Sequence, residues 1–231
     1  MKIVSIIPAR SGSKRLKNKN ISRLGDKPLI NHILEKLVHI KVISKIIIST
    51  DYPQIDKFIK KKNKKIIIEK RPKELASDKS TALDVVKSIM KKYPNFDVYS
   101  YHLPTCPFVS KIDLIKGFNI IKKKNIDFSV SVIKYEDPIE IAVKFQNDKN
   151  LIKPVFNNLK KNKTNSLQIP QSFRPSGGFY IGKKSSIMKY GNFFSGKVYG
   201  IKFSNKKFVD IDTKKNLDYA NFLLKKWKFI P

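Results

Sequence analysis

Residues 2–20 of the chain read KIVSIIPARSGSKRLKNKN and join an apolar run to a basic loop. The apolar run, Lys2–Ala9, has the length of a β-strand and is nearly continuous, which is typical of a central strand buried on both faces of a sheet. An open α/β sheet binds its ligands at the carboxyl ends of its strands. The loop Arg10–Asn20 therefore occupies the position at which a ligand is expected.

This loop has the composition of an anion-binding site. Gly12 lies between two serines and allows backbone N–H groups to turn toward an anion. Arg10, Lys14 and Lys19 add positive charge. The glycine spacing matches neither the Walker A loop nor the dinucleotide-binding Gly-x-Gly-x-x-Gly pattern. We predict that the loop cradles the phosphates of a nucleotide; the alternative is a solvated basic turn in a lysine-rich chain.

Apolar strand-like runs alternate with amphipathic stretches up to residue 133, and this alternation predicts helices on both faces of a mostly parallel sheet. We therefore expect a three-layer αβα fold with a Rossmann-like sheet. The predicted strands that follow Lys2–Ala9 are Lys45–Ser49, Lys65–Ile68, Asp97–Leu103 and Phe128–Ile133. The predicted helices are Pro28–Val38, Pro53–Lys61, Thr81–Lys92 and Lys111–Lys123.

The pattern changes after residue 133. Polar turns separate three short β-like pieces, and these predict a small antiparallel excursion from the main sheet: Ile139–Phe145, Leu151–Phe156 and Gly178–Ile181. Two further strands, Val198–Phe203 and Phe208–Ile211, and a helix, Lys214–Lys226, complete the expected fold. The chain has 231 residues and no long linker, so we expect a single domain, 1–231.

The net charge of +31 invites a nucleic-acid-binding interpretation, but only five of the 49 basic residues are arginine. Arginine is the residue that forms bidentate contacts with phosphates and bases. Lysine is spread along almost every segment, which indicates solvated surfaces, and we expect no nucleic-acid partner. No run is long enough to span a membrane, and the single Cys106 fits a reducing cytoplasm. A basic nucleic-acid-binding protein remains the alternative outside enzymes.

Two carboxylates near the end of the chain suggest a metal site. Asp210 and Asp212 lie two residues apart, so on the predicted strand both point to the same face. Mg²⁺ is held by oxygen ligands, commonly one or two carboxylates together with substrate phosphates. The alternative is that Asp212 or Thr213 caps the helix that follows.

Five segments follow the loop in a recognisable order. They are Ile47–Asp51, the run RPKELASD of Arg71–Asp78, Leu103–Pro107, Gln168–Ile181 and the run DIDT of Asp210–Thr213 with Leu217 and Ala220. Together with the loop they resemble the motifs of the acylneuraminate cytidylyltransferases, the enzymes that make CMP-activated nonulosonic (sialic-type) acids. The resemblance covers residues 3 to 220, and the order of the motifs makes it more specific than any one of them.

The resemblance implies the fold of the nucleotide-diphospho-sugar transferases and a reaction. The anomeric hydroxyl of a nonulosonic acid attacks the α-phosphorus of CTP, pyrophosphate leaves, and Mg²⁺ is the cofactor. The implied catalytic residues are Arg10, Lys14, Lys19 and Asp212, with Asp210 and Asp212 as the metal ligands. The implied nucleotide-binding residues are Ala9, Arg10, Gly12, Ser13, Lys14, Asn20, Arg71 and Ser77.

The sugar side of the implied site departs from the family pattern. Arg174 would bind the sugar's carboxylate, with Gln168, Ser176 and Leu103 beside it. Leu103 replaces a glutamine, Ser176 replaces an asparagine, and Val109 stands where arginine is common. We therefore expect a different nonulosonic acid, of the legionaminic or pseudaminic type; the alternative is an enzyme whose sugar site has lost affinity.

The resemblance also implies an assembly and a pathway. Residues 134–177 resemble the family's dimerisation insertion, so we expect a homodimer. The expected product serves the synthesis of surface glycans such as lipopolysaccharide or capsule. The alternative enzyme is a related sugar nucleotidyltransferase, for example one that activates Kdo.

Overall fold

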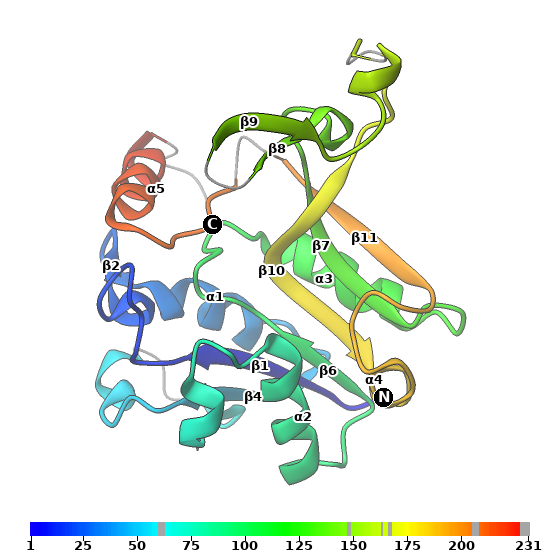
Figure 1. Ribbon diagram of the computed structural model, residues 1–231. Coiled ribbons are helices and arrows are strands. Elements are labelled where there is room, and N and C mark those ends of the chain that lie inside the picture. The colour runs from blue at the N-terminus through cyan, green and yellow to red at the C-terminus, as the bar shows by residue number, and fades with distance from the viewer. Residues whose placement is uncertain (60–62, 147–148, 163, 166–167, 205–207, 227–231) are drawn as a thin grey trace.

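A seven-stranded sheet forms the centre of the molecule in a computed structural model that describes residues 1–59, 63–146, 149–162, 164–165, 168–204 and 208–226 (Figure 1). The strands lie in the order β11-β7-β10-β6-β1-β4-β5. Their bounds are β1 Ile3–Ala9, β4 Ile43–Thr50, β5 Ile66–Lys70, β6 Val98–Tyr101, β7 Phe128–Lys134, β10 Phe173–Lys183 and β11 Val198–Phe203. Within the described residues β10 alone runs antiparallel to its neighbours, so the prediction of a mostly parallel sheet is confirmed.

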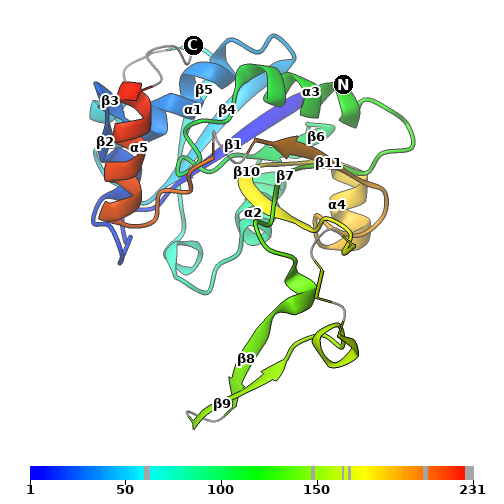
Figure 2. The ribbon, with the colours of Figure 1, turned by 90° about the horizontal axis from the view of Figure 1, so that it is seen from above.

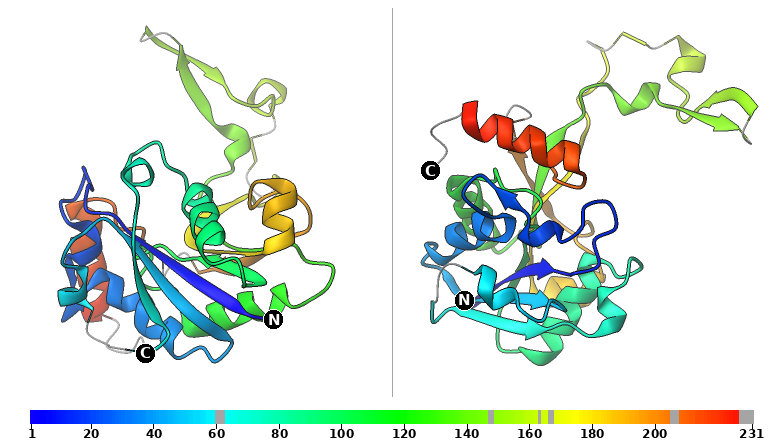
Figure 3. Two further views of the ribbon diagram at one scale, coloured as in Figure 1. Left: turned by 90° about the horizontal axis from the view of Figure 1, so that it is seen from below. Right: turned by 90° about the vertical axis from the view of Figure 1, so that its left-hand side faces the viewer.

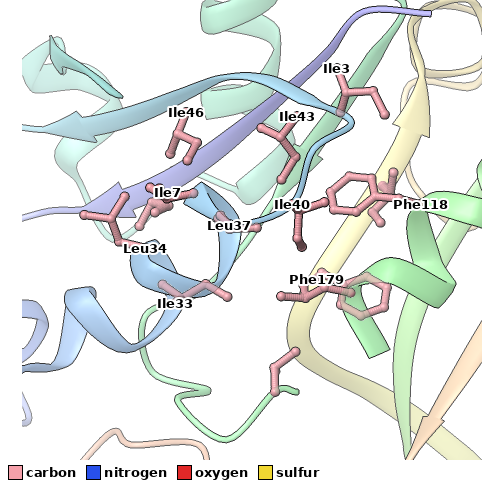
Figure 4. Close-up of a cluster of buried hydrophobic side chains, with 14 of the residues drawn as sticks. Ile3, Ile7, Ile33, Leu34, Leu37, Ile40, Ile43, Ile46, Phe118 and Phe179 are labelled. Carbon is pink, nitrogen blue, oxygen red and sulfur yellow. The ribbon is translucent and has the colours of Figure 1, made fainter. Parts of the chain in front are cut away.

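β1 is buried along its whole length and supplies both cores of the domain. Its side chains alternate between the two faces of the sheet, as they must on an extended strand. Ile3 and Ile7 belong to one cluster of buried side chains, and Val4 and Ile6 belong to the other. Figure 4 shows the first cluster, in which isoleucines of β1 and β4 lie on the same face of the sheet as Phe118 of α3 and Phe179 of β10.

Four helices cover the sheet, two on each face (Figures 1 and 3). The helices that pack on the Ile3 and Ile7 face are α1 Leu29–Val38 and α3 Lys111–Ile121; those on the other face are α2 Ala82–Lys92 and α4 Lys184–Tyr190. Local signals set their ends: Thr81 and Asp84 form a capping box at the start of α2, and Ser110 caps α3. The three-layer αβα fold is therefore confirmed.

α5, Lys214–Lys226, packs against the short hairpin that follows the loop after β1. Its buried residues Leu217, Ala220 and Leu223 join Leu24, which lies on the short hairpin β2 Arg23–Leu24 and β3 Lys27–Pro28. The Oγ1 atom of Thr213 accepts from the Asn216 amide at 3.2 Å, so Thr213 caps the helix. The loop, the hairpin and α5 thus form one connected unit.

Residues 135–172 leave the main sheet after β7 and return to it in β10. They contain a second small sheet, β8 Val143–Gln146 paired antiparallel with β9 Lys149–Pro154, and this hairpin projects away from the body of the molecule (Figure 2). The prediction of antiparallel structure in this region is confirmed. Within the predicted excursion, however, Gly178–Ile181 was misassigned, because it lies inside the main-sheet strand β10.

Two other predicted elements are wrong. Pro53–Lys61 contains a 3₁₀ turn, Ile55–Phe58, in its described part in place of an α-helix; residues 60 and 61 lie outside the described residues. The Asn31 side chain donates to the carbonyl of Phe58 at 2.7 Å, so a tertiary contact ties the end of the 3₁₀ turn to α1. The other described 3₁₀ turns are Lys19–Ile21, Lys73–Ala76, Ile139–Ile141 and Leu159–Lys161.

Phe208–Ile211 is extended loop and not a strand. Its one backbone hydrogen bond to the body joins the Ile211 amide to the Thr105 carbonyl at 2.9 Å, in the part of the chain that is described. The segment therefore lies against the loop after β6 and not against a strand. The expectation that Asp210 and Asp212 share one face of a strand is therefore wrong. The turn before α5, held by Asn216, positions them instead.

Candidate active site

A pocket of about 290 Å³ opens at the carboxyl ends of β1, β4, β5 and β6. This is the edge at which the sequence places a ligand. Three groups of residues line it: the loop after β1, the segment from Arg71 to Val85, and the carboxylates Asp210 and Asp212 with the loop after β6. The structure therefore gathers segments that are up to 200 residues apart in the chain.

Four of the cations in the loop Arg10–Asn20 are paired with two carboxylates. Arg10 and Lys14 contact Asp78 at 2.6 and 2.7 Å. Arg15 and Lys19 both contact Asp212 at 2.7 Å. Hydrogen bonds from Lys14 and Arg10 hold the pKa of the Asp78 carboxyl below its ordinary value.

The backbone of the loop is fixed at both ends. The Asn20 side chain is buried and donates to the Arg10 carbonyl at 3.0 Å, which closes the loop on itself. Asp51, at the end of β4, accepts from the amide and the hydroxyl of Ser11. These contacts hold Arg10 at the end of β1, next to the carboxyl edge of the sheet.

The smaller residues of the loop take different positions. The Ala9 carbonyl accepts from the Thr50 hydroxyl, so Ala9 joins β1 to β4. Gly12 faces open space, since a Cβ atom there would meet nothing within 4 Å. Ser13 lines the pocket, and its amide donates to the Ser11 carbonyl at 2.9 Å. The Ser13 amide is thus already engaged and does not point freely at a ligand.

Arg71 also lines the pocket. Its guanidinium is buried and donates to the hydroxyl and the carbonyl of Ser49, at 3.1 and 2.9 Å. Burial lowers the pKa of Arg71, while the neighbouring Tyr101 and Asp51 raise it. Pro8, Leu75 and Val85 also line the pocket, which therefore combines apolar walls with a buried cation, as a flat heterocycle requires.

Three hydroxyl-bearing residues flank Arg71. Ser77 is exposed at the rim, and its hydroxyl donates to the Glu74 carbonyl at 3.0 Å. Ser80 also lines the pocket, and within the described residues its hydroxyl oxygen is buried without a hydrogen-bond partner. Tyr101 lines the floor, and burial raises its pKa to about 12.

Asp210 and Asp212 face the same pocket from the loop before α5. Burial raises the pKa of the Asp210 carboxyl above its ordinary value; a hydrogen bond from Thr105 opposes that shift and the charge of Asp212 adds to it. Within the described residues the Oδ1 atom of Asp210 is buried and accepts no hydrogen bond. The Asn216 side chain accepts from the amides of Asp212 and Thr213, which fixes the turn that brings both carboxylates forward.

The four residues expected to bind a sugar are not gathered in one place. Leu103 lines the pocket. Arg174 lines a neighbouring hollow of about 180 Å³, where its guanidinium lies 5.5 Å from the centre of the Phe208 ring. Ser176 is buried and donates to Ser131 at 2.7 Å, and Gln168 is exposed on the segment before β10.

The family profile of the cytidylyltransferases matches residues 4–226, which is nearly the whole chain. The chain belongs to the cytidylyltransferase family. The match spans every segment that lines the pocket.

Several characterised proteins resemble this cytidylyltransferase along most of its length. The N-acylneuraminate cytidylyltransferase of Escherichia coli is 28% identical over 220 residues, which cover 95% of this chain and 51% of that protein. A Streptococcus agalactiae protein of the same name is 24% identical and is also covered over 51% of its length. The pseudaminic acid cytidylyltransferase of Campylobacter jejuni is 26% identical over 229 residues, with 97% of each chain covered. The chain thus spans about half the length of the first two relatives and nearly all of the third.

Solved structures share the fold of this cytidylyltransferase at low sequence identity. CMP:2-keto-3-deoxy-manno-octonic acid synthetase, solved with CTP, has a TM-score of 0.70 and 16% identity, with 98% of this chain and 99% of that chain covered. 4-Diphosphocytidyl-2C-methyl-D-erythritol synthase of Anaerococcus prevotii has a TM-score of 0.65 and 16% identity, with 96% of each chain covered. In the described part of the chain no helix is both long and apolar enough to cross a membrane.

Sequence reasoning missed several residues that line the pocket of this cytidylyltransferase, among them the hydroxyl-bearing Ser80, Tyr101 and Thr105. Ser80 lies two residues after the run Arg71–Asp78, so its position near a recognised motif was the available signal. Thr105 lies inside the motif Leu103–Pro107 but carries no chemical signal of its own. Tyr101 is the last residue of a buried strand, and nothing in the sequence distinguishes it from an ordinary core residue.

Proposed function

We propose that this cytidylyltransferase transfers CMP from CTP to the anomeric hydroxyl of a nonulosonic acid and releases pyrophosphate. The observation that supports the proposal best is a single pocket with two kinds of lining. Arg10 and Lys19 of the cationic loop line it together with the buried Arg71 and the apolar side chains of Leu75 and Val85. That arrangement fits a ligand with a heterocycle at one end and several phosphates at the other.

The nucleotide would lie with its base beside Arg71 and its phosphates on the loop. Arg10, Lys14 and Lys19 would contact the phosphates, since their charged groups reach the pocket mouth and pair with carboxylates already. Asn20 would stay a backbone clamp, because its amide holds the Arg10 carbonyl. Ser77, at the rim, would meet the ribose or the base.

Asp210 and Asp212 fit Mg²⁺ as the metal. Their carboxylates line one pocket, and the buried Oδ1 atom of Asp210 lacks a hydrogen-bond partner among the described residues. A cation beside them would offset the burial and the mutual repulsion that raise the Asp210 pKa. Among the described residues no three acidic, histidine or cysteine side chains form a metal site by themselves, so phosphate oxygens would complete the set. Bound there, Mg²⁺ would neutralise charge on the phosphates.

The residues act by position and charge. In-line attack on a phosphorus atom passes through a loose, charge-spread transition state, which cations stabilise without a covalent intermediate. Arg10, Lys14 and Lys19 would hold the triphosphate so that pyrophosphate leaves away from the sugar. Thr105 fixes the Asp210 segment by accepting from the Ile211 amide. The preorganised geometry supplies the orientation that the step requires.

The sugar acid would lie between the pocket and the hollow that contains Arg174. Leu103 borders the pocket, and the charge of Arg174 reaches Asp210, so the hollow adjoins the proposed metal site. Arg174 would bind the sugar's carboxylate through charge-assisted hydrogen bonds. Ser176 would act indirectly, because its hydroxyl is committed to Ser131 in the core. Gln168 would have to reach the sugar acid from the insertion, residues 134–177.

The acceptor would be a nonulosonic acid other than N-acetylneuraminate. Leu103 offers no hydrogen bond where the family pattern has a glutamine, and Val109 is buried. The pseudaminic acid cytidylyltransferase of Campylobacter jejuni matches this chain over almost the full length of both proteins, which favours a pseudaminic-type acid. The product would be used in the synthesis of a surface glycan such as lipopolysaccharide or capsule. A reaction that consumes CTP would take place in the cytoplasm.

The functional unit would be a homodimer. The hairpin β8–β9 projects from the body, and large apolar side chains are exposed on it and directly after it: Val143, Phe145, Leu151 and Ile152 in the hairpin, and Val155 and Phe156 after β9. Apolar surface of this extent on a projecting element is typical of a protein interface. A second copy that covers it would bring the two-fold partner's insertion toward the sugar side of the site.

A pyrophosphate-release assay tests the function. The enzyme, with Mg²⁺ and each of the four nucleoside triphosphates, is supplied with pseudaminic, legionaminic and N-acetylneuraminic acids and with Kdo. We expect turnover with CTP and one of the first two acids. Equal use of the four nucleotides would contradict the assignment of CTP, and turnover with Kdo alone would replace the proposed acceptor by the related Kdo-activating function.

The metal assignment has its own test. Asp212→Asn should lower kcat at least a hundredfold while the thermal unfolding midpoint stays close to that of the wild type, since removal of a preorganised metal ligand costs several kcal/mol of transition-state stabilisation. Asp56→Asn, which removes a carboxylate outside the pocket lining, is the matched control. Full activity of Asp212→Asn would exclude Asp212 as a ligand.

A further inference from the structure

The carboxylate of Asp78 forms ion pairs with two of the cations that the proposed function assigns to the nucleotide's phosphates. Its Oδ1 atom lies 2.6 Å from Arg10 Nη2, and its Oδ2 atom lies 2.7 Å from Lys14 Nζ. Both oxygens of the carboxylate are therefore engaged by the anion-binding loop. A phosphate that contacts Arg10 and Lys14 must take over the same donors.

We propose that Asp78 is an internal competitor of the nucleotide's phosphates and sets how much phosphate charge a ligand must carry to bind. The inference rests on the proposed function, because it takes the loop to be the phosphate site. A ligand with one phosphate would gain little over the carboxylate that it displaces. A triphosphate brings more charge and more acceptors, and it displaces Asp78 with a net gain.

The surroundings of the two cations allow this exchange. Arg10 keeps a second anchor, because its Nη1 atom donates to the Ala76 carbonyl at 3.2 Å. The guanidinium can therefore release Asp78 and stay at the pocket mouth. The Lys14 side chain is 82% exposed and can turn toward a ligand with little loss of packing. The Asp78 side chain is itself 47% exposed, so water receives it once it is displaced.

Two other roles for Asp78 have less support. A role as a third metal ligand requires it to lie with Asp210 and Asp212, but no three acidic, histidine or cysteine side chains gather into such a group among the described residues. A role in recognition of the base requires a position beside Arg71. Asp78 contacts the cations of the loop at the pocket mouth instead.

Binding of three probes to Asp78→Asn tests the inference. Isothermal titration calorimetry would measure the affinity of CTP, of inorganic tripolyphosphate and of cytidine for the full chain. We expect Asp78→Asn to bind CTP and tripolyphosphate about fourfold more tightly than the wild type, since two part-exposed ion pairs each contribute about a factor of two. Cytidine carries no phosphate, so its affinity should not change.

The controls separate competition from a general change of charge or fold. Asp56→Asn removes the same formal charge outside the pocket lining and should leave all three affinities at the wild-type value. Thermal unfolding of Asp78→Asn should match the wild type. Equal or weaker binding of CTP and tripolyphosphate by Asp78→Asn, or tighter binding of cytidine, would overturn the inference.

The outcomes also separate this inference from the proposed function. Tighter tripolyphosphate binding by Asp78→Asn, without turnover of any sugar acid, would support the competitor and contradict the function. Turnover of a nonulosonic acid with CTP, but no gain in affinity in Asp78→Asn, would support the function and overturn the competitor. A wild-type chain that binds neither CTP nor tripolyphosphate would overturn both.

Discussion

Arg71 carries a charge in a place where most side chains are apolar, and its two contacts with Ser49 are what make this burial tolerable. Lysine would retain the charge but would offer a single ammonium in place of a planar fork. We expect Arg71→Lys to raise the KM for CTP about tenfold, because a charged hydrogen bond is worth roughly 1.5–3 kcal/mol. The measurement is a CTP titration in the pyrophosphate-release assay.

Arg23→Lys is the matched control, since Arg23 donates to the Asp26 carbonyl on the surface, outside the pocket lining. It should leave the KM unchanged. A wild-type KM in Arg71→Lys would mean that the guanidinium supports the fold only.

His32 makes stability depend on pH. Burial lowers its pKa to about 4, against the opposing contact of its ring with the Leu24 carbonyl, and the charge of Lys27 lowers it further. In the unfolded chain the pKa returns to about 6.5, so the unfolded state binds the proton first as the pH falls. We expect the free energy of unfolding to be fully retained above about pH 6.5 and to fall by about 3 kcal/mol on this account by pH 4.

Urea unfolding between pH 7 and pH 4 measures this effect. His32→Gln keeps a donor for the Leu24 carbonyl and should show a shallower loss than the wild type. His39→Gln alters an exposed histidine and should follow the wild type. An unchanged pH slope in His32→Gln would contradict the prediction. His102, which is fully buried with a pKa of about 3, adds a loss of the same sign in all three proteins.

The residues expected to bind a nucleotide are gathered around one pocket more closely than those expected to bind a sugar, and the reason is local. Arg10, Lys14 and Lys19 follow one strand directly, so the rule for carboxyl ends places them together. Arg174 and Ser176 lie two residues apart on β10, so a regular strand would point both to one face. The pairing of β10 with β7 shifts register between Pro175 and Tyr180, and Ser176 is buried and donates to Ser131, which the sequence pattern does not reveal.

At the scale of elements, α1 is tied to the loop after β6 through Lys36. Its ammonium donates to the Pro107 carbonyl at 2.6 Å, and burial, aided by Lys27, lowers the pKa of Lys36 to about 8. We expect Lys36→Met, which keeps the aliphatic stem, to lower the free energy of unfolding by about 1–2 kcal/mol, because a charged hydrogen bond to a partly buried carbonyl is lost.

Chemical denaturation at pH 7 gives this value. Lys41→Met, on an exposed lysine, is the control and should cost less than about 0.5 kcal/mol. Equal stability of the wild type and Lys36→Met would show that the contact contributes nothing net. A loss of kcat in Lys36→Met would further indicate that the tether positions Thr105.

Elements that bury an apolar face could be predicted from the sequence, and elements defined by tertiary contacts could not. Thr81–Lys92 and Lys111–Lys123 were found within a few residues because their spacing and caps agree. Pro53–Lys61 failed because only Ile55 is buried among its described residues, which leaves little packing to stabilise a helix. Phe208–Ile211 looks like a strand by composition, yet the sheet already ends at β11.

At the scale of the whole molecule, the hairpin β8–β9 is the feature with most exposed apolar surface. Phe145 and Ile152 lie opposite each other in the hairpin, and their side chains are 71% and 55% exposed. We expect Phe145→Glu to convert a dimer to single chains at micromolar concentration, because a charge buried in an apolar interface costs several kcal/mol. Light scattering after size exclusion measures the mass.

Phe222→Glu is the matched control, since Phe222 is an exposed phenylalanine on α5. It should leave the mass unchanged. A wild-type protein that elutes as a single chain, or a Phe145→Glu variant that keeps the dimer mass, would contradict the proposed homodimer.

The reversed direction of β10 has a consequence for divergence within the family. β7 runs toward the edge that carries the pocket, and β10 runs back from it, so residues 135–172 depart and return at one edge. A segment attached in this way can lengthen, shorten or change its sequence without altering how the strands pair. β1, β4 and the loop after β1 lie outside this segment. Under the proposed function, acceptor choice and assembly can therefore change between relatives while the residues that would bind the nucleotide stay the same.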